Sequence, residues 1–137
     1  MASKSVALRV LVADDDRDTA NVLGLILRDE GHDVHIALRG DEVSNIDRLL
    51  RPDVVILDLN MPGMSGYAVA REIRERRGPL APLLVAVSGS WKTRSDQRVA
   101  AALGFDHYLL KPCEPADLVA LVDAFARRGR GEASGVN

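Results

Sequence analysis

Five polar side chains of this sequence each come directly after a short apolar run, where a strand would give way to a loop. They are Asp14 and Asp15 after Leu8–Ala13, Asp58 after Val54–Leu57, Ser88 after Leu83–Val87, and Lys111 after His107–Leu110. Parallel strands end at one edge of a sheet, and ligands of open α/β sheets bind at that carboxyl edge. We therefore expect these side chains to gather around one crevice, although Asp58 taken alone fits a turn equally well.

The chemistry of this set is that of a phosphoryl group and a metal ion. Three carboxylates in one crevice repel one another, and a divalent cation relieves that repulsion. Hard oxygen ligands favour Mg²⁺, which takes one or two carboxylates together with a phosphate oxygen. The Lys111 ammonium and the Ser88 hydroxyl could hold further phosphate oxygens. The carboxylate that remains free could attack phosphorus and form an aspartyl phosphate.

Alternating strands and helices would position these side chains. The apolar runs predict strands at Leu8–Ala13, Asp33–Ala37, Val54–Leu57, Leu83–Val87 and His107–Leu110. Helical spacing predicts one helix capped by Asp16 or Asp18 and ended by Gly31, and four more at Gly40–Leu50, Tyr67–Arg76, roughly Thr93–Leu103 and Pro115–Arg127. In the second helix, the buried stripe is expected to be Val43, Ile46, Leu49 and Leu50.

Five strands alternating with five helices indicate an α/β fold with a doubly wound five-stranded parallel sheet. The first, third and fourth strands are the most continuously apolar, so we expect them in the interior of a flavodoxin-like order 2-1-3-4-5. The switch point of that order lies between strands one and three. Asp14 and Asp15 would therefore leave the sheet beside Asp58.

Composition limits the function classes. The 137 residues fit one domain with its own core, and the net charge of −2 gives no reason to expect direct binding to nucleic acid. A single cysteine, Cys113, excludes an internal disulfide and favours a reducing, cytoplasmic location. No apolar run is long enough for a membrane span.

Four segments together resemble the motif blocks of bacterial response-regulator receiver domains, of the chemotaxis-type single-domain kind. The segments are Val10–Asp16, Val54–Gly66, Val87–Gly89 and Tyr108–Pro112. The resemblance covers about residues 8 to 126. It implies a receiver domain over residues 1–128 and a flexible tail over residues 129–137.

The resemblance also implies a role for each site residue. Asp58 would be the phosphoacceptor, taking its phosphoryl group from a histidine kinase or a histidine phosphotransfer protein. Mg²⁺ would be bound by Asp14, Asp15, Asp58 and the backbone carbonyl of Asn60. Lys111 and Ser88 would hold the phosphoryl group, and Tyr108 would turn inward as a switch when Ser88 engages it. The Lys111–Pro112 peptide bond would be cis.

Other polar residues have simpler explanations. We expect Asp16 and Asp18 to serve as helix caps rather than as ligands. His32, His35 and His107 have no metal-site spacing and are expected at the surface or on edge strands. The arginines of the third and last helices, among them Arg76 and Arg77, are expected on solvated faces.

We expect the domain to transmit its signal through contacts with other proteins. Only about ten residues follow the last predicted helix, which leaves no room for an effector domain. By resemblance, a downstream partner would bind the fourth helix, fifth strand and fifth helix, and any weak homodimer would use the same face. Such a domain would catalyse its own phosphorylation and dephosphorylation without turning over a separate substrate, so it would not be an enzyme in the usual sense.

Three alternatives stay open at this point. The chain could be a receiver module cut from a hybrid histidine kinase. It could be a phosphatase of the haloacid dehalogenase type, although that class has a second Asp two positions after its nucleophile, where this chain has Asn60. A receiver-like binding module without phosphorylation is disfavoured because every chemical position is filled.

Overall fold

The computed structural model describes residues 7–89, 98–99, 101–111 and 114–128. The elements follow one another as β1 (Arg9–Ala13), α1 (Arg17–Asp29), β2 (Asp33–Ala37), α2 (Gly40–Leu50), β3 (Val54–Asp58), α3 (Gly66–Arg77), the short 3₁₀ turn η1 (Gly78–Leu80), β4 (Leu83–Ser88), β5 (His107–Leu110) and α5 (Pro115–Arg128). Residues 98–99 and 101–102 are helical and fall within the predicted fourth helix. The predicted tail over 129–137 lies outside the described residues.

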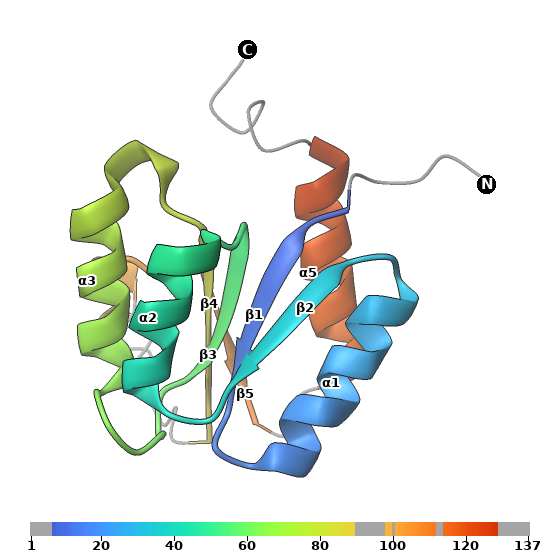
Figure 1. The fold of residues 1–137 in the computed structure, drawn as a ribbon, viewed down its shortest axis with the longest axis horizontal. Helices are drawn as coiled ribbons and strands as arrows, with labels where there is room; N and C mark the ends of the chain where they lie inside the picture. The colour runs from blue at the N-terminus through green and yellow to red at the C-terminus, as the bar shows by residue number, and fades with distance from the viewer. Residues whose placement is uncertain (1–6, 90–97, 100, 112–113, 129–137) are drawn as a thin grey trace.

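The five strands form one parallel sheet in the order β2-β1-β3-β4-β5, which confirms the predicted topology. Figure 1 shows α1 and α5 on one face of this sheet and α2 and α3 on the other. Both faces are covered because each crossover between parallel strands must place its helix on one side or the other. No helix within the described ranges is both long enough and apolar enough to cross a membrane.

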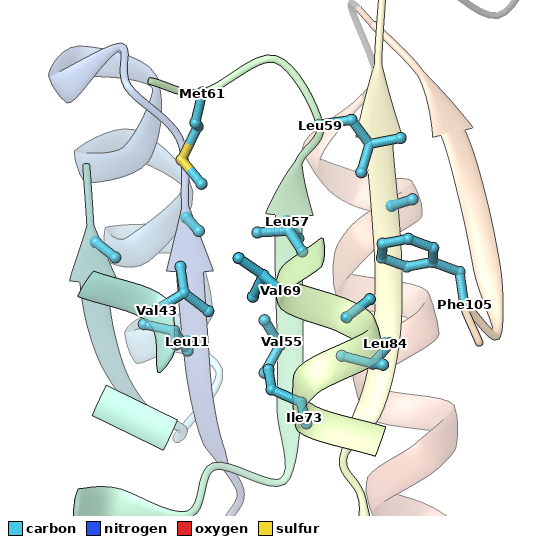
Figure 2. Packing of buried hydrophobic residues seen from close by; sticks show 14 residues of the cluster. Leu11, Val43, Val55, Leu57, Leu59, Met61, Val69, Ile73, Leu84 and Phe105 are labelled. Carbon is cyan, nitrogen blue, oxygen red and sulfur yellow. The ribbon is translucent and has the colours of Figure 1, made fainter. Parts of the chain in front are cut away.

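The core consists of two layers, one on each side of the sheet. Side chains alternate along a strand, so neighbouring residues face opposite layers. Leu11, Val55 and Leu84 pack towards α2 and α3 (Figure 2), whereas Val10 and Val54 belong to the cluster that includes Leu118 and Val122 of α5. The central strands are therefore apolar on both faces, as the sequence pattern predicted.

The N-cap of α1 is one of the two residues that the sequence offered for it. Asp16 begins α1 and its side chain accepts hydrogen bonds from the amides of Asp18 and Thr19, so Asp16, and not Asp18, is the N-cap. Gly31 and Gly78 have positive φ angles of 100° and 56°, just after the ends of α1 and α3. Glycine adopts this backbone region at little cost, which explains why these helices end there.

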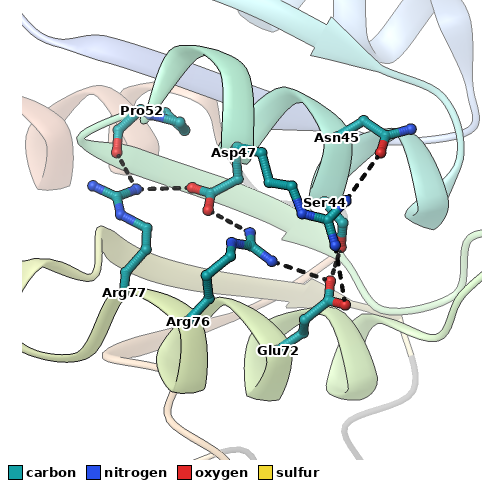
Figure 3. A network of polar contacts seen from close by, with 8 residues as sticks. Ser44, Asn45, Asp47, Pro52, Glu72, Arg76 and Arg77 are labelled. Carbon is teal, nitrogen blue, oxygen red and sulfur yellow. Dashed lines mark hydrogen bonds and ion pairs between the residues drawn. The ribbon is translucent and has the colours of Figure 1, made fainter.

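Asp47, rather than Leu49, is the buried residue on one side of α2. Leu49 is 81% exposed and Asp47 is 0% exposed, so the predicted stripe was wrong at this position. Arg76 and Arg77 of α3 pair with the two oxygens of Asp47, at 2.6 and 2.8 Å. Figure 3 shows these pairs between the two helices, together with the contact from Arg76 to Glu72. The prediction that Arg76 and Arg77 lie on a solvated face is wrong for Arg77, which is only 9% exposed.

His32 was expected at the surface or on an edge strand, and it is buried immediately before the edge strand β2. Its Nδ1 accepts a hydrogen bond from the amide of Leu8 at 3.1 Å, and its Nε2 lies 3.1 Å from Oδ1 of Asp123. An acceptor Nδ1 requires that Nε2 carry the ring proton and donate to Asp123. His32 therefore joins the start of the sheet to α5.

A close backbone approach fixes the loop between β3 and α3. The amide of Gly40 donates to the carbonyl of Pro62 at 3.0 Å. A Cβ atom on Gly40 would lie 1.9 Å from the carbonyl oxygen of Met64, so no larger residue fits without moving the backbone. The start of α2 thus holds the loop that follows Asp58.

We expect Gly40→Ala to lower the free energy of unfolding by about 1–3 kcal/mol, as overpacking does elsewhere. Urea denaturation measures this change. Gly24→Ala is the matched control because its Cβ would meet mainly the flexible side chain of Ile36, at 3.3 Å, and alanine favours a helix interior. Equal stability of the two variants would show that the loop is not held at Gly40.

Candidate functional site

The strand register brings the predicted acidic residues together. Ala13 of β1 is paired with Leu57 of β3, so the next residues along, Asp14 and Asp58, are neighbours at the carboxyl edge. Both carboxylates are buried, with Asp58 only 4% exposed. The amide of Asp14 donates to the carbonyl of Ala37 at 3.0 Å, which fixes the backbone at the end of β1. The predicted switch point between β1 and β3 is therefore the place where the two carboxylates meet.

Each carboxylate oxygen of Asp58 has a hydrogen-bond partner. Oδ1 accepts a hydrogen bond from the amide of Asn60 at 3.0 Å, and Oδ2 lies 2.9 Å from Nζ of Lys111. The first contact is an Asx turn, which accounts for the turn-forming role that the sequence allowed. Asp58 thus begins the turn and also lies in the site.

Lys111 bridges the two buried carboxylates. Its Nζ lies 3.0 Å from Oδ2 of Asp14 as well as 2.9 Å from Oδ2 of Asp58. Burial acts to lower the pKa of Lys111, but hydrogen bonds and charges from Asp58 and Asp14 outweigh it, so the pKa is raised. Lys111 is therefore a cation whose charge is shared between two anions.

The ionised form of Asp14 is disfavoured by burial at this site. Its burial raises the pKa of Asp14 above the ordinary value, and the nearby charge of Asp58 acts in the same direction. Hydrogen bonds from the Asp16 amide, at 2.9 Å, and from Lys111 oppose the increase without cancelling it. One ammonium does not neutralise the carboxylates here, which leaves excess negative charge.

This donor set fits Mg²⁺. Carboxylate oxygens of Asp14, Asp15 and Asp58 all lie within 4.8 Å of one another, with Asp15 exposed and the other two buried. Only oxygen ligands are offered, and the exposed side leaves room for the waters that Mg²⁺ keeps. Asn60 follows Asp58 closely enough for its backbone to border the same group.

Ser88 and Tyr108 lie on the neighbouring strands. Ser88 ends β4, is buried and pairs in register with Leu110, and its carbonyl accepts a hydrogen bond from the amide of Lys111 at 3.0 Å. Tyr108 of β5 is partly buried and packs against the core cluster on the α2 and α3 side. The sheet therefore places Ser88 next to the backbone of Lys111.

A hollow that the sequence did not indicate adjoins these residues. The lining of this cavity of about 430 Å³ includes Asp14, Asp58 and Lys111 together with apolar side chains, among them Leu23 and Leu118. Leu23 belongs to α1 and Leu118 to α5, so the cavity extends between the two helices. The apolar part of its lining could have been found only by knowing which helix faces meet.

Some predictions fall outside the described residues. Pro112 and Cys113 are among them, so the predicted cis bond between Lys111 and Pro112 has no structural description. The same holds for most of the predicted fourth helix and for residues 90–97.

Sequence comparison identifies the family. A family model described as the response regulator receiver domain matches residues 10–123. This chain belongs to the response-regulator receiver family. The match covers every element from β1 to most of α5, including each of the residues that meet at the site.

Individual relatives agree with this assignment. The receiver is similar to the DNA-binding response regulator MtrA of Mycobacterium tuberculosis, with 39% identity over 90% of this chain and 53% of the relative. It is 33% identical to the cell cycle transcriptional regulator CtrA of Caulobacter vibrioides over 94% of this chain and 54% of the relative. The chain therefore spans about half the length of the curated relatives it matches.

The fold agrees with solved receiver structures as well. The Francisella response regulator 1452 receiver domain matches with a TM-score of 0.81 and 26% identity, over 88% of this chain and 98% of that one. The protein is thus the receiver domain of a two-component response regulator, a signalling module rather than an enzyme that turns over a separate substrate.

Proposed function

We propose that Asp58 accepts a phosphoryl group from a phosphohistidine donor and that its phosphorylation switches a protein-binding surface. The observation that carries this proposal is the contact set of Asp58: a buried carboxylate at the end of β3, bound by Lys111 and grouped with Asp14 and Asp15. Family membership supports the signalling class, and the residue roles are our proposal.

The transfer is a displacement at phosphorus. An oxygen of Asp58 attacks, the bond between phosphorus and the donor's imidazole nitrogen breaks, and that nitrogen keeps the electron pair. Lys111, which contacts Oδ2 of Asp58 at 2.9 Å, moves its ammonium to an oxygen of the transferred group. The Ser88 hydroxyl, at the next strand end, donates to another. Such reactions depend mainly on positioning and on the neutralisation of charge.

Asp14 and Asp15, with Asp58 and the Asn60 carbonyl, would hold Mg²⁺. The bound ion supplies charge neutralisation between the carboxylates and the phosphoryl oxygens. Burial raises the pKa of Asp14, and the ammonium of Lys111, 3.0 Å away, opposes that increase. A cation at this position favours the ionised form.

Phosphorylation would change the protein-binding surface through Ser88 of β4 and Tyr108 of β5. When the Ser88 hydroxyl turns to the phosphoryl group, Tyr108 of β5 turns inward, and the face formed by the fourth helix, β5 and α5 changes. That face would bind the downstream protein or a second copy of the domain. We also propose that the domain spans residues 1–128, with 129–137 as a tail, and that it works in the cytoplasm with its kinase.

Intact-mass measurement after incubation with acetyl phosphate and Mg²⁺ tests this proposal. We expect wild type to gain the mass of one phosphoryl group, and chelation by EDTA to prevent the gain. Asp58→Asn should show no gain, because the amide is not a nucleophile toward phosphorus. Asp41→Asn, an exposed Asp of α2, is the matched control and should behave as wild type. A phosphoryl group retained on Asp58→Asn would refute the assignment.

A further inference from the structure

The hydrophobic core holds β5 less tightly than it holds the central strands. All five residues of β3 are buried, whereas none of the four residues of β5 is, and β5 lies at the edge of the sheet beside β4. Yet β5 leads directly to Lys111, whose ammonium contacts the carboxylates of Asp14 and Asp58. Contacts besides core burial are therefore needed to fix the position of this strand.

Arg74 of α3 binds the segment that leads into β5. Its Nε donates to the carbonyl of Gly104 at 2.8 Å, and its Nη2 donates to the same carbonyl and, at 2.9 Å, to Oδ2 of Asp106. The same oxygen of Asp106 accepts a hydrogen bond from the amide of Leu84 in β4, at 2.8 Å. One guanidinium group thus connects α3 to the beginnings of both β4 and β5.

Two further features bring this entry segment, residues 104–106, against α3. Gly104 has a φ angle of 103°, and a Cβ atom there would lie 3.0 Å from Cγ of Arg74, so glycine permits both the backbone conformation and the close approach. The buried Phe105 packs in the core layer on the α3 side of the sheet (Figure 2), with its ring 6.3 Å from that of Tyr67 and at 80° to it. Each of these three consecutive residues therefore contacts α3.

The amino end of α3 adjoins the phosphorylation site. A Cβ atom on Gly66, the first residue of α3, would lie 3.0 Å from the Cα atom of Leu59, the residue that follows Asp58. The helix therefore packs on the backbone next to Asp58 at one end and binds the entry segment of β5 towards the other. It connects the two strands that lead to Asp58 and Lys111.

We propose that Arg74 is a positioning residue for phosphoryl transfer, which holds the Lys111 ammonium beside Asp58 by fixing β5. This inference rests on the proposed function. Only the four residues of β5 separate the entry segment from Lys111, so a displacement of that segment also displaces Lys111. A shift of about 1 Å at a reacting group can slow a reaction by about a hundredfold. The pairing of β5 with β4 remains without Arg74 and limits the loss.

Arg74→Met tests this role, because methionine keeps much of the length of the side chain and removes the guanidinium. With acetyl phosphate and saturating Mg²⁺, we expect the phosphorylation rate, measured by intact mass, to fall about tenfold. The affinity for Mg²⁺ alone, measured by calorimetry, should stay within about twofold of wild type, because the carboxylates that would bind the ion follow β1 and end β3. A general loosening of the site would instead weaken both.

Two other variants of α3 complete the comparison. Arg71 lies about one turn before Arg74, is 72% exposed and pairs only with Glu75 of its own helix among the described residues, so Arg71→Met should keep the rate within about twofold of wild type. Arg74→Lys should restore the rate to within about threefold of wild type, because an ammonium can still donate to Gly104 or to Asp106.

Asp106→Asn keeps the test valid if Arg74→Met does not fold. Asn retains an oxygen for the Leu84 amide but loses the charge that pairs with Arg74, so the rate should fall at least about threefold with unchanged Mg²⁺ affinity. An unchanged rate, or equal losses of rate and of Mg²⁺ affinity, would overturn the positioning role. A wild-type protein that gains no phosphoryl group would refute the proposed function itself, and this inference with it.

Discussion

Asp14→Asn should slow Mg²⁺-dependent phosphorylation by at least about a hundredfold, the usual cost of losing one charge-stabilising group at such a site. Asn keeps an oxygen that can accept from the Asp16 amide, so the local backbone is preserved. It removes one of the three carboxylates that lie within 4.8 Å of one another. Intact-mass time courses at several Mg²⁺ concentrations measure the change.

The same substitution should raise the melting temperature in EDTA. The folded-state pKa of Asp14 is raised, chiefly by burial, so the cost of ionising it is absent below its unfolded-state pKa and fully present above its folded-state pKa. At neutral pH the wild type carries that cost, and Asn does not. Without a metal ion, the variant is therefore expected to be the more stable protein.

Asp16→Asn is the matched control for both measurements. Asp16 belongs to the same acidic run, but it caps α1, and Asn caps helices as well as Asp does. We expect its phosphorylation rate and its melting temperature in EDTA to stay close to those of wild type. If the two variants behaved alike, Asp14 would have no special role in the site.

Asp47→Ala should lower the free energy of unfolding by about 3–5 kcal/mol, the range for breaking one partner out of a buried ion pair. Asp47 is 0% exposed and binds two guanidinium groups, so its loss leaves Arg76 and Arg77 without their shared anion. The contacts of Arg76 with Glu72 and of Arg77 with Pro52 remain and limit the damage.

Urea denaturation of Asp47→Ala and Asp41→Ala separates this effect from the general loss of a carboxylate. Asp41 lies on the same helix, and its side chain is mostly exposed beside Arg39, so its removal should cost less than about 1 kcal/mol. A loss below about 1 kcal/mol for Asp47→Ala as well would mean that the buried pairs between α2 and α3 contribute little.

The sequence predicts the sheet order from the continuously apolar strands, and it predicts the acidic group from the residues at the strand ends. Four apolar runs end in Asp14, Asp58, Ser88 and Lys111, and a parallel sheet brings such ends to one edge. The register then places Asp14 beside Asp58 without any detail of side-chain packing. Local sequence patterns therefore suffice to predict that Asp14 and Asp58 meet at one edge of the sheet.

Side-chain burial on the helices is less predictable. A hydrophobic stripe assigned Leu49 to the core, whereas α3 offers arginines on the side where Asp47 lies, and Asp47 is buried in its place. His32 is buried for a similar reason: its partners Leu8 and Asp123 are distant in sequence. Buried polar residues need specific partners, and the sequence alone does not show which helix faces meet.

The chemical location of the phosphoryl group distinguishes Asp58 directly from its neighbouring carboxylates. After phosphorylation with acetyl phosphate and Mg²⁺, borohydride reduces an aspartyl phosphate to homoserine, and peptide mass spectrometry then reads the position. We predict homoserine at position 58, with Asp14 and Asp15 unchanged. Homoserine at position 14 or 15, with Asp58 intact, would contradict the assignment of Asp58 as the acceptor.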